Sequence, residues 1–168
     1  MWQNTVTLWE KAKVALEKGK WTQVARDLGL LQAAKKDAWE WNEQAAEEKE
    51  NALRAKAMLD ALLRAEASVG REDVSFDVLS EDHDGVVKAL AGLGGKTPPY
   101  LVLLKTQLET VEARQAVLLG ESRRLEQALD LLQQDMPPYA EIVKVVDQAC
   151  ESKEEALKIG RASCRERV

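Results

Sequence analysis

The residues whose types and spacing come closest to chemistry are residues 91–100, AGLGGKTPPY. GLGGKT resembles a phosphate-binding loop of the G-x-x-x-x-G-K-[ST] kind, in which backbone N–H groups and a lysine hold the phosphates of a nucleotide. Residues 95–97 fit the end of that motif, but Leu90 stands where its first glycine is required. Pro98 also disfavours helical geometry at Thr97, where the loop must open a helix. The sequence therefore predicts no nucleotide binding.

A second copy of the same turn supports this interpretation. Residues 86–118 align with residues 125–157 at an offset of 39, with nine identities in 33 positions that include the whole PPY. The second copy is LQQDMPPY and has neither glycine nor lysine before its prolines. Proline suits the first turn of a helix, where a missing N–H costs no intrahelical bond. The recurring element is thus predicted to be helix stop, turn and helix start, at Pro98, Pro99, Pro137 and Pro138.

The other candidates for metal or catalytic chemistry are incomplete. SEDHDG at residues 80–85 is similar to a calcium loop, but Ser80 and Ala91 replace acids that the motif requires. His83 is the single histidine, so a histidine metal site or triad has no second member, and we expect a solvated loop residue. Cys150 lies on a predicted helix face, where we expect buried packing rather than a reactive thiol. We therefore expect no catalytic, metal or cofactor site and no enzyme activity.

The last ten residues, IGRASCRERV, match the translation of a common sequencing adapter, so we interpret residues 159–168 as an artefact and the chain as a fragment. Without them the net charge moves from −5 to −7, and Cys150 is the one cysteine that stays. A lone cysteine, no apolar run of about 18 residues and no visible signal peptide predict an intracellular protein, cytoplasmic or nuclear, without membrane contact. The acidic balance argues against nucleic-acid binding.

Strong helix formers dominate the composition, while aromatic residues make up 5% of the chain. We therefore predict an all-α fold of elongated antiparallel helical hairpins, or a coiled-coil-like bundle, with no sheet. Residues 1–67 are predicted to form an N-terminal hairpin, broken at Gly19, with one long second helix over residues 21–67 in which Gly29 and the polar NEQAAEEKEN are the places to bend or fray. The tryptophans at positions 2, 9, 21, 39 and 41 are expected to pack this hairpin together. A seven-residue repeat on the long helix consists of Val24, Leu31, Ala38, Ala45, Ala52 and Leu59.

The second part of the chain is an acidic stretch, SVGREDVSFDVLSEDHD, which predicts a linker over residues 68–84. Val74, Phe76 and Leu79 alternate with polar residues, which indicates a short extended piece within it. Ser80 is a suitable N-cap for a short helix that runs to about residue 93.

Residues 85–158 carry the clearest periodicity, a helical segment punctuated by the two PPY turns. Apolar residues recur there at alternating steps of three and four, the a/d pattern of a coiled coil or long helical hairpin. Gln115 and Ser122 are the polar members of that pattern. The predicted helix-packing seam consists of Leu101, Leu104, Leu108, Val111, Leu118, Leu125, Leu129 and Leu132. A further helix begins at Pro137.

LWEKAKVALEKGKWTQVARDLGLLQAA at residues 8–34 and LETVEARQAVLLGESRRLEQALDLLQQ at residues 108–134 carry a family resemblance. They resemble the PLU-1-like helical region of JARID-class histone lysine demethylases, with a Trp-led helix, L-x-x-L spacing and later helices broken by prolines. The resemblance spans about residues 6–157. It implies a noncatalytic helical arm in the nucleus, because the zinc-finger cysteines and iron-binding residues of that family do not occur in this sequence.

Two other architectures stay open at this point. A tetratricopeptide-like peptide-binding array would explain the first hairpin, but its period is 34 residues rather than 39. A generic coiled-coil or spectrin-like scaffold would explain every periodicity. The sequence therefore predicts a noncatalytic scaffold or protein-interaction region that binds a protein partner or self-associates through its seams, and that binds no nucleotide.

Overall fold

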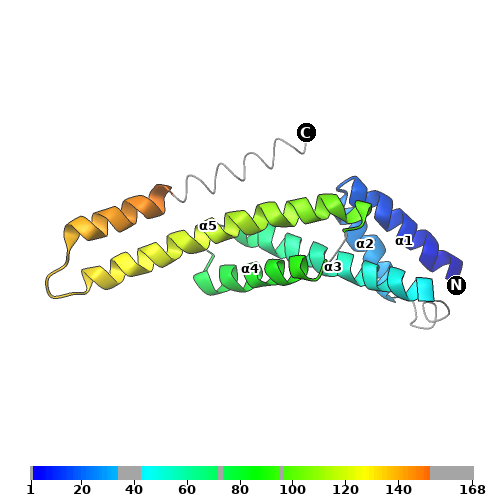
Figure 1. The fold of residues 1–168 in the computed structure, drawn as a ribbon, viewed down its shortest axis with the longest axis horizontal. Coiled ribbons are helices and arrows are strands. Elements are labelled where there is room, and N and C mark those ends of the chain that lie inside the picture. The colour runs from blue at the N-terminus through cyan, green and yellow to red at the C-terminus, as the bar shows by residue number, and fades with distance from the viewer. Residues whose placement is uncertain (1, 34–42, 72–73, 95–96, 152–168) are drawn as a thin grey trace. The chain divides into compact units, whose positions relative to one another are not determined.

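The computed structural model describes residues 2–33, 43–71, 74–94 and 97–151, and every regular element among them is helical. The elements are α1 (Trp2–Glu17), α2 (Trp21–Ala33), α3 (Glu43–Val69), α4 (Phe76–Ala91), the 3₁₀ helix η2 (Pro99–Leu101) and α5 (Val102–Leu132) (Figure 1). A C-terminal helix is described over residues 139–151. The described residues contain no strand, so the predicted all-α class is confirmed.

The helices divide into two packed units. The first unit combines Met1–Leu63 with Val86–Leu108, and the second combines Arg64–Gly85 with the chain from Glu109 onward. The helices α3, α4 and α5 therefore each contribute one end to each unit.

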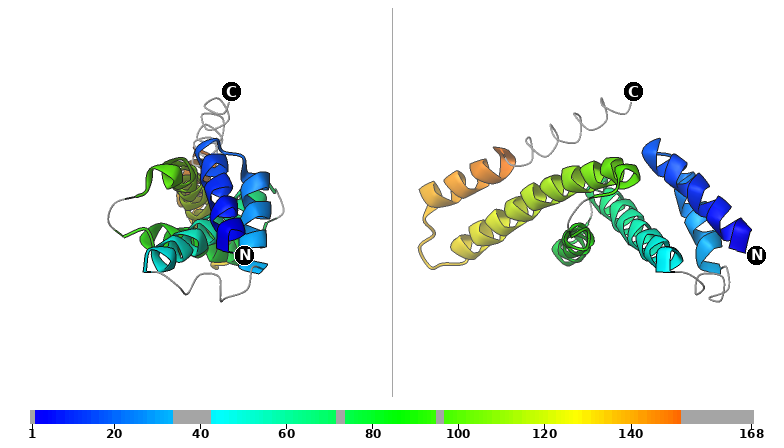
Figure 2. Two further views of the ribbon diagram at one scale, coloured as in Figure 1. Left: turned by 90° about the vertical axis from the view of Figure 1, so that its right-hand side faces the viewer. Right: turned by 45° about the vertical axis from the view of Figure 1, so that its right-hand side comes forward.

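Within the first unit, α1 and α2 form a tight antiparallel hairpin (Figure 2). Gly19 has φ +64°, the left-handed conformation that closes many helices. Its N–H donates to the Leu16 carbonyl at 3.1 Å, and the Lys20 N–H donates to the Ala15 carbonyl at 2.9 Å. These two bonds are those of a Schellman motif, so Gly19 ends α1 as its position in KGKW predicts.

The core of the first unit is built from the apolar faces of its helices. Ala52, Ala55, Leu59 and Leu62 on α3 are buried, as the seven-residue repeat and its flanking positions predict. The other buried large side chains of this unit are Trp9, Leu16, Val24, Leu28, Leu31, Met58, Val86, Leu93, Leu101, Leu104 and Leu108. The single helix predicted over residues 21–67 corresponds to α2 and α3. Residues 34–42 between them, with Ala38 and Trp41, lie outside the described residues.

The structure differs from the linker predicted over residues 68–84. Helix α3 runs to Val69, and α4 already begins at Phe76, so most of the acidic stretch is helical. Ser75 rather than Ser80 is the N-cap residue, since its hydroxyl accepts a hydrogen bond from the Val78 N–H at 3.4 Å. Phe76 and Leu79 are not alternating strand residues but neighbours on one helix face, three residues apart. The acidic residues of α4 (Asp77, Glu81, Asp82 and Asp84) lie on other faces of that helix, and a run of acidic residues by itself does not distinguish a helix surface from a loop.

Both PPY sequences lie at helix starts. Pro98 has extended geometry (φ −57°, ψ 144°), Pro99 opens η2, and α5 follows directly at Val102. In the second copy the Pro138 carbonyl accepts hydrogen bonds from the N–H groups of Glu141 at 2.9 Å and Ile142 at 3.0 Å, which closes the first turn of the C-terminal helix. Residues 95–96 of the phosphate-loop look-alike, Lys96 included, are outside the described residues.

Candidate functional site

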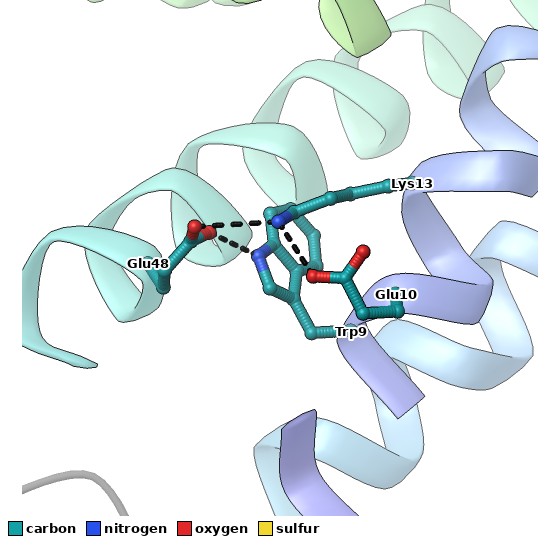
Figure 3. Close-up of polar contacts among 4 residues, drawn as sticks. All are labelled: Trp9, Glu10, Lys13 and Glu48. Atoms are coloured by element: carbon teal, nitrogen blue, oxygen red, sulfur yellow. Dashed lines mark hydrogen bonds and ion pairs between the residues drawn. The ribbon is translucent and has the colours of Figure 1, made fainter. Parts of the chain in front are cut away.

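The densest polar arrangement in the first unit surrounds Trp9 on α1 (Figure 3). The Trp9 indole Nε1 donates a hydrogen bond to Glu48 Oε2 on α3. Lys13 Nζ lies 3.3 Å from Glu48 Oε1 and 2.9 Å from Glu10 Oε1, so one ammonium bridges two carboxylates. The Trp9 ring meets the Tyr100 ring edge to face, with centroids 5.5 Å apart and an interplanar angle of 85°.

The ammonium of Lys13 also lies against both rings, 5.3 Å from the Trp9 centroid and 5.5 Å from that of Tyr100. Burial lowers the pKa of Lys13, but the hydrogen bonds to Glu10 and Glu48 together with the negative charges of both carboxylates raise it above the ordinary 10.5. Burial, followed by the negative charge of Glu48, raises the pKa of Tyr100 above 10.0. Because the Trp9 indole and the Lys13 ammonium bond the Glu48 carboxylate and the Tyr100 ring packs on Trp9, the arrangement ties α1, α3 and η2 together, as expected for a packing tryptophan.

In the second unit, the predicted loop residue His83 lies on α4 and is partly buried. Its Nε2 lies 3.2 Å from Glu112 Oε1 on α5, so the expectation of a solvated loop histidine is wrong. The calcium-loop look-alike at residues 80–85 lies entirely within α4, whose helical backbone does not form a calcium loop. In the part of the chain that the structure describes, no group of three or more His, Cys, Asp or Glu residues is placed to hold a metal ion.

Cys150 is also placed differently from the prediction. It is exposed on the C-terminal helix, whereas the neighbouring Ala149 is buried. One residue along a helix turns the side chain by about 100°, which directs Cys150 away from the side on which Ala149 is buried. Helical periodicity starting from Ile142 and Val145 would have shown this.

The predicted seam on α5 is buried only in its first half. Leu101, Leu104, Leu108 and Val111 are buried, and Gln115 has 0% exposure. Leu118 is partly buried and packs with the second-unit cluster of Val69, Leu79 and Leu119, which also contains Val74 and Phe76. Leu125, Leu129 and Leu132 are exposed instead.

Two causes account for this change along α5. A strict 3.5-residue repeat drifts by about 20° per heptad against a straight helix of 3.6 residues per turn, so a long seam rotates off its packing face. The packing neighbour also changes, because Ala128 and Leu131 pack against Ile142, Val145 and Val146 of the C-terminal helix.

The end of α5 and the C-terminal helix form a hairpin in the second unit, joined by the turn at the second PPY (Figure 1). The Arg124 guanidinium donates a hydrogen bond to the Gln148 carbonyl at 3.1 Å, at the end of the hairpin away from the turn. Six large apolar side chains of this hairpin are exposed, and we name them the hairpin face: Leu125, Leu129, Leu132, Met136, Tyr139 and Val143.

The hairpin face follows from helix geometry. Leu125, Leu129 and Leu132 are spaced by four and three residues on α5, and Tyr139 and Val143 by four on the C-terminal helix, so each set follows one helix stripe, while Met136 lies in the turn between them. On each helix the exposed stripe is rotated by about 100° about the helix axis from the buried face, in the direction of increasing residue number. Because the two helices are antiparallel, this equal rotation brings both stripes to the same side of the hairpin.

The chain was compared with known proteins, and no family model, curated protein or solved structure matches it. The PLU-1-like resemblance therefore stays a prediction from the sequence. In the described part of the chain no helix has both the length and the apolarity needed to cross a membrane.

Proposed function

We propose that this chain is a noncatalytic helical scaffold that binds a protein partner through the hairpin face. The observation that supports the proposal is the gathering of exposed apolar side chains there. Leu129 is 58% exposed, Tyr139 68% and Met136 88%, whereas the same helices bury smaller residues such as Ala128 and Ala149. The buried side of the hairpin is already filled by this packing, with Ile142 and Val145 in it, so the exposed set is a second group of large apolar side chains left in contact with water.

The size of the hairpin face also favours a binding role. With their exposed fractions, its six side chains present roughly 600 Å² of accessible surface, the upper end of the largest apolar patch on a typical monomeric protein. Patches of that size commonly mark interaction sites. Single exposed leucines elsewhere, such as Leu30 on α2 and Leu53 on α3, are ordinary for a folded surface.

The PLU-1-like resemblance is compatible with this proposal and adds to it. If it holds, the chain is the helical arm of a chromatin-modifying demethylase, and the hairpin face is one of the surfaces by which that arm contacts other proteins. The tetratricopeptide-like alternative instead predicts peptide binding by stacked hairpins of 34 residues, and the two PPY turns recur at 39.

Site-specific photo-crosslinking tests the proposal. A benzophenone amino acid is placed at Leu129 in the hairpin face, or at Leu53, which is similarly exposed in the first unit. In irradiated cells that express the chain, we expect a discrete heavier species from position 129 that contains a second polypeptide, and none from position 53. Identical crosslinking patterns at the two positions, or no crosslinked species at position 129, would contradict a binding role for the hairpin face.

A further inference from the structure

We infer that the hairpin face takes one particular partner, a basic amphipathic helix that lies along the two helices and completes a three-helix bundle. This inference rests on the proposed function and specifies its occupant. Both the shape of the face and the charge along its edges support this occupant.

The shape comes from the two apolar stripes. On α5 the residues Leu125, Leu129 and Leu132 step by four and three, the spacing of a coiled-coil seam, and Tyr139 and Val143 follow one face of the antiparallel C-terminal helix beside them. Arg124 bonds Gln148, and Ala128 packs in one cluster with Ile142 and Val145, and in the antiparallel register that fits both observations Leu129 lies near Val143. A third helix with its own apolar stripe packs into the groove between two such helices, as in helical bundles.

The charge comes from the residues that border the face on its outer sides. Glu126 lies about 60° beyond Leu129 on α5, and Asp147 lies about 40° beyond Val143 on the C-terminal helix. Both carboxylates are exposed, and the register places them level with each other on opposite edges. A helix in the groove would therefore have an acid on each flank.

The basic residues of the hairpin do not neutralise the negative charge of Glu126 and Asp147 at these edges. Arg123 and Lys144 lie further round their helices than Glu126 and Asp147, away from the face. Arg124 is engaged with the Gln148 carbonyl between the two helices. Lysine or arginine on both flanks of the incoming helix would thus meet complementary charge.

The same edges argue against a second copy of this chain as the occupant. Two hairpins packed face to face would bring the acidic edges of one copy against the acidic edges of the other. Like charges opposed across an interface disfavour that pairing. The geometry therefore points to a partner of opposite charge rather than to self-association.

The test uses two synthetic 28-residue peptides with leucine at the a and d positions of four heptads. One carries lysine at the flanking e and g positions, and its twin carries glutamate there, so each repels itself and stays unpaired. Binding of fluorescently labelled peptide to the full chain is measured by anisotropy in about 50 mM salt. We expect the lysine peptide to bind at least about tenfold more tightly than the glutamate peptide, and this preference to shrink as salt is raised.

Three variants locate the binding. Leu129→Asp removes the apolar centre and should abolish binding, while Leu53→Asp, at an exposed leucine of the first unit, should leave it unchanged. The double reversal Glu126→Lys with Asp147→Lys should invert the preference, so that the glutamate peptide binds more tightly. Circular dichroism verifies that each variant keeps its helix content.

The outcomes separate this inference from the proposed function. Equal affinity for the two peptides, or a preference that survives the double reversal, would overturn the basic partner. If the chain binds neither peptide but dimerises in sedimentation, and Leu129→Asp abolishes the dimer, the occupant of the hairpin face is a second copy of the chain and not a basic helix. Binding to neither peptide, combined with a discrete crosslink from position 129, would overturn the helical occupant while the proposed function stands.

Discussion

Gln115 offers the sharpest test of the packing described above. It lies on α5 between Val111 and Leu119, four residues from each, and its exposure is 0%. Its amide nitrogen Nε2 and oxygen Oε1 have no hydrogen-bond partner among the described residues. A buried polar group without a partner loses its bonds to water on folding and gains none in return. The Gln115 amide therefore destabilises the folded state.

Replacement of this side chain by methionine keeps an unbranched chain of nearly the same length and removes both polar atoms. An unsatisfied buried amide costs about 1–3 kcal/mol, so Gln115→Met should raise the free energy of unfolding by about 1–2 kcal/mol. For a chain of this size that corresponds to an increase in Tm of about 2–8 °C. Thermal and urea unfolding followed by circular dichroism at 222 nm measure both quantities.

The matched control is Gln127→Met on the same helix, where the side chain is exposed. Glutamine and methionine have similar helix propensities, so the control should change the free energy of unfolding by less than about 0.5 kcal/mol. If Gln115→Met lowers the stability by about 1 kcal/mol or more while the control is neutral, the amide has hydrogen-bond partners in the folded protein. That result would refute the expectation that the buried Gln115 amide is unsatisfied.

Two further predictions concern the first unit. Gly19→Ala should lower the free energy of unfolding by about 1–2 kcal/mol, because an alanine there must adopt φ +64°. Gly29→Ala should instead raise it by about 0.5–1 kcal/mol, because Gly29 lies inside α2 and an added Cβ would meet open space. Urea unfolding measures both changes. Burial and the charge of Glu48 raise the pKa of Tyr100, and the carboxylate partners of Lys13 raise its pKa against the effect of burial. Both groups hold their protons more tightly when folded, so their stabilisation is complete below about pH 10 and is lost as the pH rises through the folded-state pKa values. Urea midpoints between pH 8 and 11 should fall less in Tyr100→Phe than in the unaltered chain, and equal slopes would contradict this.

The local signals in the sequence were sufficient for the helices and for several of their ends. Composition predicts the all-α class, and the description of every regular element as helical confirms it. Gly19 ends α1 as predicted because a left-handed cap depends on one residue and its immediate neighbours. The burial of Ala52 and Leu59 follows from a repeat that a single helix face dictates.

The predictions were wrong where the structure of a segment, or the burial of a residue, depends on which other helix packs against it. The acidic residues 76–84 look like a linker until Phe76 and Leu79 have Val69 and Leu119 to pack against. Cys150 is exposed because the C-terminal helix directs Ile142, Val145 and Ala149 to its buried side.

The hairpin face shows most clearly which features the sequence predicts and which depend on tertiary packing. Sequence periodicity alone identified Leu125, Leu129 and Leu132 as a stripe, because spacing along a helix fixes which residues share a face. Only the tertiary structure decided that this stripe is exposed while Ala128 and Leu131 beside it are covered. A helix stripe is a property of one segment, whereas its burial is a property of a pair. The neighbouring helix, its direction and its register select which of two adjacent stripes is removed from water.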